Sequence, residues 1–218
     1  ENLSNQNFNK FYKRAELCFK FRDKAEKITG ERKSYFINVT AETNEMIKRA
    51  KFVADKGGEY VMIDFLTAGF AGFQTLKEFC DDHKLAIHVH RAMHAALDRS
   101  PKHGISMLTL AKLVRLIGGN NLHIGTVVGK LVGSRDDVLL LNSEMVKDKI
   151  KENKQNLYQD WCGIKDVVPV SSGGLHAGLV PNVMDLLGRN CVLQLGGGIH
   201  GHPDGTKAGA ISLRQAID

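Results

Sequence analysis

The chain has 218 residues, of which 43% are hydrophobic and 25% are charged, and its formal net charge is +6. A chain of this length and composition can bury a sizeable core, so we expect it to fold as one domain. It contains no apolar run of the ~20 residues that a membrane helix needs, and its first thirty residues are too charged for a signal peptide. We therefore expect a cytoplasmic protein with no membrane partner.

The positive charge does not by itself indicate nucleic-acid binding, because basic residues are spread over many helical segments and alternate with Asp and Glu. Solvated helix faces explain it more simply, and no nucleic-acid partner is expected. The four cysteines, Cys18, Cys80, Cys162 and Cys191, are far apart and form no C-x-x-C pair. This spacing argues against a zinc site or a redox motif and favours reduced thiols.

Short runs rich in β-branched and aromatic residues alternate with segments of helical periodicity along the chain. The expected strands are Tyr35–Val39, Tyr60–Asp64, Leu85–His90, Asn121–Gly125, Val167–Ser171 and Val192–Gly196. The expected helices are Gln6–Ile28, Thr43–Lys56, Ala71–His83, Ile105–Ile117, Asp136–Lys151, Leu179–Leu187 and Thr206–Ala216. Several strands are apolar nearly throughout, which is typical of parallel strands covered on both faces.

This βα alternation, with a helix before the first strand, predicts an α/β fold: a partial (β/α)₈ TIM barrel that lacks its first two strands. In such barrels the loops after the last two strands often bind phosphate, and here glycine-rich segments follow the last two expected strands. A doubly wound sheet is the alternative architecture. It explains the pattern less well, because Gly196–Gly198 lacks the spacing of a dinucleotide fingerprint.

The segment Ile87–His94 places three imidazoles and a guanidinium at the end of an expected strand. Side chains alternate along a strand, so His88 and His90 share one face. His90 is a candidate proton carrier, and the planar fork of Arg91 suits phosphate, with a salt bridge at the rim as the structural alternative. We expect His88 and His94 to be packing or supporting groups.

Two glycine-rich loops are candidate anion sites, since backbone N–H groups can approach an anion where no Cβ intervenes. The residues concerned are Gly196, Gly197 and Gly198 in one loop and Ser172, Gly173 and Gly174 in the other. Glycine alone would also suit an ordinary turn. Two such loops after neighbouring strands favour a phosphate site.

His123 and Lys130 complete the candidate residues. His123 lies in the fourth expected strand and is a candidate proton carrier or phosphate donor. Lys130 stands between Gly129 and Gly133, so a hinged loop could close a cation over a bound ligand. A solvated surface lysine is the alternative interpretation.

These motifs closely resemble the large subunit of ribulose-1,5-bisphosphate carboxylase/oxygenase, RuBisCO. The matching stretches are His90–Ala95, His123–Lys130, Ser172–His176 and Gly196–Pro203, in the family's order and spacing. The likeness extends over essentially the whole chain. The sequences of Asn38–Met46 and Leu85–Met107 are most similar to those of archaeal form III or form II/III enzymes.

The resemblance implies a role for each matching residue. Lys130 resembles the mobile-loop lysine that stabilises the attacked CO₂, and His90 resembles the histidine beside the metal that takes part in proton transfer. The remaining residues resemble the phosphate-binding groups: Arg91, His123 and Ser172 for one phosphate, and Gly173, Gly174, Gly196 and Gly197, with Lys130 approaching, for the other.

The resemblance also implies Mg²⁺, held partly by a CO₂-derived lysine carbamate. Glu1 resembles the last ligand of the Lys-x-Asp-Glu-Asn motif, whose lysine and aspartate are not among these residues. One carboxylate cannot supply the ~six oxygens that Mg²⁺ requires. We therefore expect residues 1–218 to be a C-terminal catalytic barrel domain truncated at both ends, and inactive alone.

The implied partners are ribulose 1,5-bisphosphate, CO₂ and O₂, in a homodimer or higher homo-oligomer at full length. Two departures from the family pattern are Val132, where an acid is frequent, and Ser171, where alanine is usual. A RuBisCO-like enolase or isomerase is the alternative enzyme, although such proteins usually lose the loop lysine or a phosphate ligand. A non-catalytic phosphosugar-binding fragment is the third hypothesis.

Overall fold

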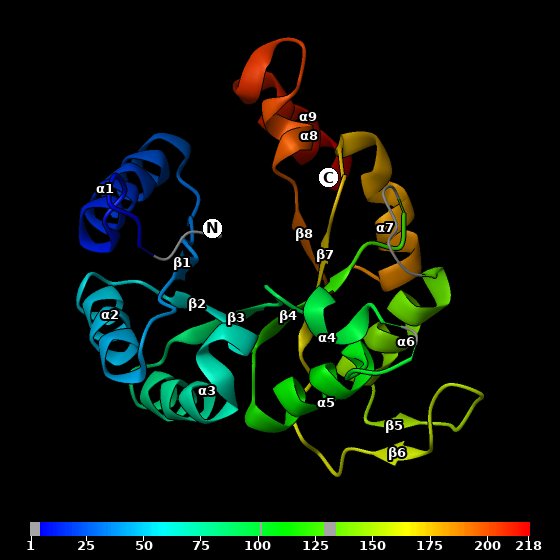
Figure 1. Cartoon of the computed structure of the whole chain (residues 1–218). Helices are drawn as coiled ribbons and strands as arrows, with labels where there is room; N and C mark the ends of the chain where they lie inside the picture. The colour runs from blue at the N-terminus through cyan, green and yellow to red at the C-terminus, as the bar shows by residue number, and fades with distance from the viewer. Residues whose placement is uncertain (1–4, 101, 129–133) are drawn as a thin grey trace. The chain divides into compact units, whose positions relative to one another are not determined.

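The computed structural model describes residues 5–100, 102–128 and 134–218, and Figure 1 shows the whole chain. The chain divides into two compact units. The first unit comprises Glu1–Gly104 and Ile117–Asn120, and the second comprises Ile105–Leu116 and Asn121–Asp218. Both units are built from parallel strands and helices.

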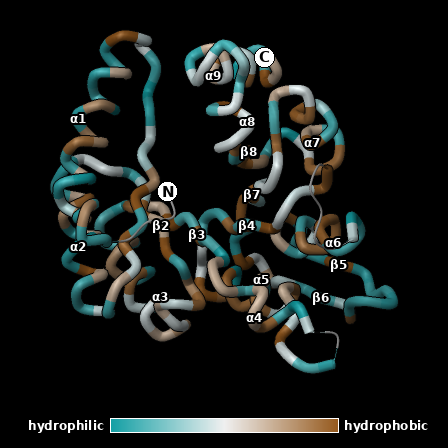
Figure 2. Tube along the Cα trace, turned by 45° about the horizontal axis from the view of Figure 1, so that its top comes forward, coloured by the Kyte–Doolittle hydropathy of each residue, from teal (hydrophilic) through white to brown (hydrophobic). Residues whose placement is uncertain are grey.

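The first unit contains three parallel strands in the order of the chain. These are β1 (Ile37–Asn38), β2 (Tyr60–Asp64) and β3 (Ala86–His90). The helices are α1 (Phe11–Thr29), α2 (Thr43–Asp55), α3 (Phe65–Asp82) and α4 (Ala95–Asp98). Figure 1 shows α1, α2 and α3 along one side of the strands, and the first two helices alternate polar and apolar segments in Figure 2.

The centre of β2 and β3 is buried, as the apolar sequence of these strands requires. The register of this pair places Asp64, at the end of β2, opposite His90, at the end of β3. Helix α3 follows β2 at once and starts at Phe65, earlier than the expected Ala71. Gly69, with φ of 78°, interrupts its helical geometry, and only the part after this kink shows a regular helical pattern in the sequence.

The second unit also contains three parallel neighbouring strands. These are β4 (Asn121–Gly125), β7 (Val168–Ser172) and β8 (Val192–Gln194). Its helices are α5 (Met107–Ile117), α6 (Arg135–Val146), α7 (Val180–Leu187), α8 (Gly197–His200) and α9 (Gly205–Ile217), with a 3₁₀ turn at Ala177–Leu179. All six expected strands are therefore present in the two units.

An antiparallel hairpin between α6 and β7 corrects one expectation. Helix α6 was expected to continue to Lys151 but ends at Val146, and β5 (Lys149–Ile150) then pairs with β6 (Gln159–Asp160). The buried Arg115 on α5 explains the change. Its guanidinium donates to the carbonyl oxygens of Glu144 and Lys147, at 2.6 and 2.8 Å, and to those of Ile164 and Lys165, at 3.0 and 3.1 Å.

The guanidinium carbon of Arg115 also lies 4.4 Å from the centre of the Trp161 ring. The buried Arg115 thus binds the chain on both sides of the hairpin to α5. The helical periodicity of α6 could not indicate these contacts, because they involve a different helix. Within the part of the chain that the structure describes, no helix combines the length and the apolar character needed to cross a membrane.

Candidate active site

The first set of candidate residues is centred on a histidine–aspartate pair at the ends of β2 and β3. His90 Nδ1 lies 2.6 Å from Asp64 Oδ1, and the two side chains are 19% and 13% exposed. An ionised carboxylate can only accept a hydrogen bond, so the proton of this bond belongs to Nδ1. In the neutral ring Nε2 then has the lone pair and is the atom that can take up or release a proton.

Asp64 is itself held by residues at the end of β1. Asn38 Nδ2 donates to Asp64 Oδ2 at 2.9 Å, and the Asp64 backbone N–H donates to Thr40 Oγ1 at 2.8 Å. The Thr40 backbone N–H donates in turn to Asn38 Oδ1 at 3.0 Å. Asn38 is fully buried and Thr40 nearly so, so these bonds form away from competing water.

Neither Asp64 nor Asn38 was among the candidates from the sequence. The available signal was an acid and an amide inside otherwise apolar strands, each at or near a strand end. Recognising it requires the register of β1, β2 and β3, because the carboxyl ends of parallel strands meet at one edge.

Arg91 follows His90 where the chain leaves β3. Burial lowers the pKa of its guanidinium, and the nearby Asp98 carboxylate acts in the opposite direction. Arginine remains charged in proteins, so Arg91 is a partly desolvated cation suited to an anion. His94 Nδ1 lies 2.6 Å from Asp98 Oδ2, and the chain turns through Met93 with φ of 69°.

His88, in contrast, points into the packed interior. It is only 4% exposed, and its ring centre lies 5.0 Å from that of Phe36. This placement is that of a packing residue, as the sequence suggested.

The second unit brings His123 and Ser172 together on neighbouring strands. His123 Nδ1 lies 3.1 Å from Ser172 Oγ, within hydrogen-bond distance, and His123 is 3% exposed. Ser172 ends β7, directly before the first glycine-rich loop. Either side chain can donate a hydrogen bond to a bound oxygen, and both can do so when the imidazole carries a proton on each ring nitrogen.

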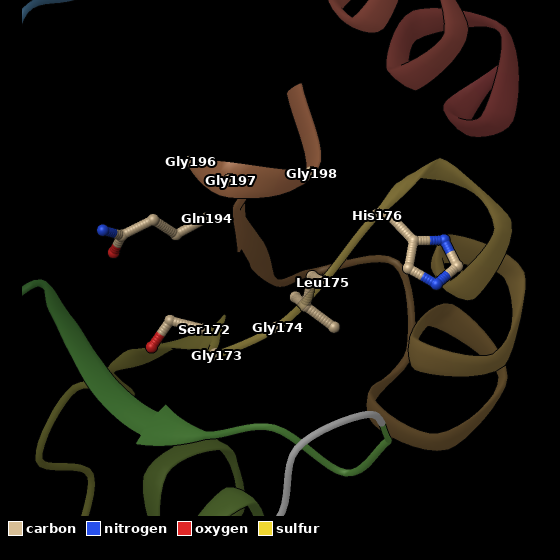
Figure 3. A pocket seen from close by; sticks show the side chains of 9 residues that line it. All are labelled: Ser172, Gly173, Gly174, Leu175, His176, Gln194, Gly196, Gly197 and Gly198. Atoms are coloured by element: carbon tan, nitrogen blue, oxygen red, sulfur yellow. The ribbon is translucent and has the colours of Figure 1, made fainter. Parts of the chain in front are cut away.

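A cavity of about 410 Å³ lies beside Ser172, and Figure 3 shows it. It is lined by Ser172, Gly173, Gly174, Leu175, His176, Gln194, Gly196, Gly197 and Gly198. The side chains of Ser172 and Gln194 extend to the same side, which agrees with their pairing in the β7–β8 register. Gln194 was not predicted from the sequence, and His176 belongs to the motif Ser172–His176 but was not itself a candidate.

The glycines around this cavity have different physical reasons to be glycine. Gly173 and Gly174 have φ of 118° and 66°, which L side chains rarely adopt. A Cβ on Gly198 would lie 2.1 Å from the Leu175 carbonyl oxygen, so this position is required by packing. A Cβ on Gly196 or Gly197 would meet no atom within 4 Å. These last two positions leave open space beside backbone N–H groups, as an anion site needs.

The candidate residues therefore gather in two sets, each inside its own unit. His90 and Arg91 are in the first unit, and the second contains His123, Ser172, Gly173, Gly174, Gly196 and Gly197. Glu1, Lys130 and Val132 lie outside the described residues. Among the residues that are described, no group of three His, Cys, Asp or Glu side chains is placed to hold a metal ion. They do not by themselves fit the oxygen shell of Mg²⁺.

Comparison with known proteins gives a consistent result over the whole chain. The family model for the ribulose bisphosphate carboxylase large chain, catalytic domain, matches residues 1–218. The ribulose bisphosphate carboxylase of Methanocaldococcus jannaschii is 53% identical over 220 residues, covering 100% of this chain and 51% of the relative. That of Pyrococcus abyssi is 46% identical, covering 100% of this chain and 49% of the relative.

Solved structures agree with these sequences. The dimeric archaeal RuBisCO from Hyperthermus butylicus has a TM-score of 0.91 and 45% identity, covering 100% of this chain and 51% of that one. The octameric enzyme from Pyrococcus horikoshii has a TM-score of 0.90 and 46% identity, covering 100% and 50%. The α/β class and the partial (β/α)₈ barrel predicted from the sequence are thereby confirmed.

The chain spans about half the length of the curated relatives it matches. Within that span, the family model covers every residue and the identity to archaeal relatives is about one half. The chain belongs to the family of RuBisCO large chains.

Proposed function

We propose that these residues are the carboxylating part of an archaeal RuBisCO, which converts ribulose 1,5-bisphosphate and CO₂ into 3-phosphoglycerate. One observation carries the proposal. Most of the described candidate residues stand at or just after the carboxyl ends of β3, β7 and β8, where barrel enzymes carry their catalytic groups, and His123 lies within β4 beside Ser172. The same residues occupy the positions of the family's motifs.

The proposed reaction starts with removal of the proton on C3 of the bisphosphate. The electron pair of the broken C–H bond forms the C2–C3 enediolate, and C2 then attacks CO₂ to form a new C–C bond. Water adds at C3, the C2–C3 bond breaks, and protonation of the released carbanion gives two molecules of 3-phosphoglycerate. O₂ would compete with CO₂ for the same enediolate, which is the oxygenase reaction of the family name.

His90 would take part in these proton transfers through Nε2, because Nδ1 is engaged by Asp64. General acid–base catalysis by a positioned side chain contributes typically 10²–10⁴-fold in rate. The side chain of Lys130, by family resemblance, would stabilise the carboxylate that forms when CO₂ is attacked.

Phosphate binding is proposed for both units. In the first, Arg91 would supply a charge-assisted donor. In the second, His123 and Ser172 would donate from side chains, and Gly173, Gly174, Gly196 and Gly197 would donate from backbone N–H groups into the cavity beside them.

Magnesium is implied only by the family to which the chain belongs. When bound, it would polarise the oxygens of the sugar and stabilise the enediolate. Glu1 would be one of its ligands, together with a lysine carbamate and an aspartate outside residues 1–218. The described residues do not assemble a metal shell by themselves.

We also propose that residues 1–218 work as a catalytic barrel domain joined to further chain, as a homodimer or a higher homo-oligomer in the cytoplasm. The coverage of about half of each relative supports the first point. The structures of similar sequence described as dimeric and octameric support the second.

A chimaera tests the proposal directly. These 218 residues would replace the matching half of the Methanocaldococcus jannaschii relative, and fixation of radiolabelled CO₂ into 3-phosphoglycerate would be measured with and without Mg²⁺. Size-exclusion chromatography and circular dichroism establish that the chimaera is folded. We expect Mg²⁺-dependent fixation by the chimaera and none by the 218-residue chain alone.

Other outcomes identify the alternatives. Consumption of the bisphosphate without incorporation of label would indicate a RuBisCO-like enolase or isomerase. Binding of the bisphosphate without turnover would indicate a phosphosugar-binding fragment. Fixation by the isolated chain would contradict the expectation that residues 1–218 need a further part.

A further inference from the structure

Three polar side chains at the ends of β1, β2 and β3 are connected in series. Asn38 donates to Asp64 Oδ2 at 2.9 Å, and Asp64 Oδ1 accepts from His90 Nδ1 at 2.6 Å. The connection is shielded, since Asn38 is fully buried and the Asp64 and His90 side chains are less than one-fifth exposed. Hydrogen bonds in such surroundings are stronger than in water.

We propose that Asp64 and Asn38 are positioning residues that fix the tautomer and the ring orientation of His90. The link from this arrangement to catalysis rests on the proton-transfer function proposed above for His90. A neutral imidazole has one N–H, and a carboxylate held at Nδ1 keeps that N–H on Nδ1. Rotation of the ring by half a turn would replace Nδ1 by a carbon and leave the buried Asp64 oxygen without its donor, which is costly.

Asn38 makes this arrangement directional. Its amide oxygen accepts from the Thr40 backbone N–H at 3.0 Å, so its NH₂ group must face Asp64. The Thr40 hydroxyl oxygen accepts from the Asp64 backbone N–H at 2.8 Å, which fixes the main chain at the same point. Asp64 therefore meets a donor at each carboxylate oxygen.

The backbone around Asn38 is held by a further group. Arg49 Nη1 on α2 donates to the Thr40 carbonyl oxygen at 3.0 Å, and Arg49 Nε bonds Glu45 Oε1 at 3.0 Å. A local arrangement with this many interlocking bonds can hold a side chain within the narrow tolerance that proton transfer requires. A residue serving only the fold would not need to control which ring nitrogen carries the proton.

The first test is spectroscopic and needs no variant. In the chimaera labelled with ¹⁵N-histidine, the His90 resonances are assigned by comparison with His90→Gln, and the ¹⁵N shifts distinguish Nδ1–H from Nε2–H. We expect the neutral ring of His90 to carry its proton on Nδ1. A neutral ring protonated on Nε2 would overturn the proposal whether or not the chimaera fixes CO₂.

The second test uses Asp64→Asn, which keeps the shape but presents an amide that can donate to Nδ1. We expect the His90 tautomer to change to Nε2–H, and exchange of the bisphosphate C3 proton with solvent to slow by about 10²–10⁴-fold. Bisphosphate affinity should stay within about threefold, because the phosphate-binding groups are untouched. Asn38→Asp replaces the donor that faces Asp64 Oδ2 with an acceptor, so it should slow the exchange by a smaller factor while the proton of His90 stays on Nδ1.

Asp55→Asn, at the exposed end of α2, is the matched control and should change neither the tautomer nor the exchange rate. A folded Asp64→Asn chimaera with an unchanged tautomer overturns the proposal, even if its activity falls, since the role of Asp64 would then be structural. Failure of the wild-type chimaera to exchange the C3 proton would instead count against the proposed function.

Discussion

The two units prepare their candidate groups in different ways. At the ends of β1–β3 the orientation of His90, the proposed proton carrier, is set by hydrogen bonds between side chains, through Asp64 and Asn38. At the ends of β7 and β8 the groups are mostly backbone N–H donors beside open space, at Gly196 and Gly197. A proton carrier needs one atom aimed correctly, whereas an anion needs several donors and room.

This difference predicts opposite sensitivities. A side-chain network should fail when one atom changes from acceptor to donor, although the shape is kept. A backbone cradle should tolerate such exchanges nearby but respond to a single added methyl group. This contrast can be tested in the full-length chimaera.

Removing the imidazole should have the largest effect. We expect His90→Ala to slow exchange of the bisphosphate C3 proton by about 10²–10⁴-fold, while bisphosphate affinity changes only a few-fold. Isotope exchange measures the first quantity and calorimetric titration the second. His83→Ala, on the exposed end of α3, is the control. A residual exchange rate within tenfold of the wild type would remove His90 from its proposed role.

The glycines of the second unit offer a matched pair. Gly198→Ala brings a methyl group 2.1 Å from the Leu175 carbonyl oxygen, and overpacking of this kind costs about 1–3 kcal/mol of unfolding free energy. Gly197→Ala meets no atom within 4 Å, so it should leave stability unchanged. It should instead weaken bisphosphate binding about tenfold, because the methyl group occupies the space beside the donors. Equal melting temperatures for the two variants would refute the assignment of Gly198 to packing.

The same contrast explains which features were predictable from the sequence. The strands were predictable because apolar runs buried on both faces leave a local signal, and all six were found. His90 was a candidate by residue type. Asp64 and Asn38 were missed because their role depends on the register of three strands, which no single segment specifies.

Long-range contacts account for most of the remaining differences. The hairpin after α6 depends on Arg115, whose carbonyl partners lie 29 to 50 residues further along the chain. The early start of α3 was missed for a local reason, because a kink at Gly69 interrupts the helical periodicity. The sequence cannot distinguish Gly197 from Gly198, because both are glycines of the same run. They differ only in the structure, where the Leu175 carbonyl oxygen lies close to Gly198.

Phosphate donors of the two units should differ in strength. Arg91→Ala removes a charge-assisted donor worth roughly 1.5–3 kcal/mol, which corresponds to one to two decades in bisphosphate affinity. Ser172→Ala removes a neutral donor worth roughly 0.5–1.5 kcal/mol, or about twofold to tenfold. Titration of both variants with the bisphosphate compares them directly. Unchanged affinity in Arg91→Ala would make the guanidinium a structural group of the rim.

The smallest expected effect is the loss of helix capping at low pH. It again differs between the units, because the capping groups differ. In the first unit the N-terminus of α2 is capped by a carboxylate, as Glu42 accepts from the backbone N–H groups of Asn44 and Glu45 at 3.0 and 3.2 Å. These bonds hold the pKa of Glu42 below its ordinary value. In the second unit the backbone N–H of Asp137 in α6 donates to the Ser134 hydroxyl at 3.1 Å, and the Ser134 backbone N–H donates back to Asp137 Oδ2 at 3.2 Å.

The pKa of Glu42 is lower in the folded protein than in the unfolded chain. Its stabilising contribution is therefore complete above the ordinary glutamate pKa of about 4.3. It is lost as the pH falls through the folded value. Amide hydrogen exchange, corrected for its intrinsic pH dependence, should show protection at Asn44 and Glu45 decreasing in acid. The Asp137 N–H bonds a hydroxyl, which does not titrate there, so its protection should decrease less than that at Asn44 and Glu45. In Glu42→Gln the decrease at α2 should disappear, and its persistence would mean that another group caps this helix.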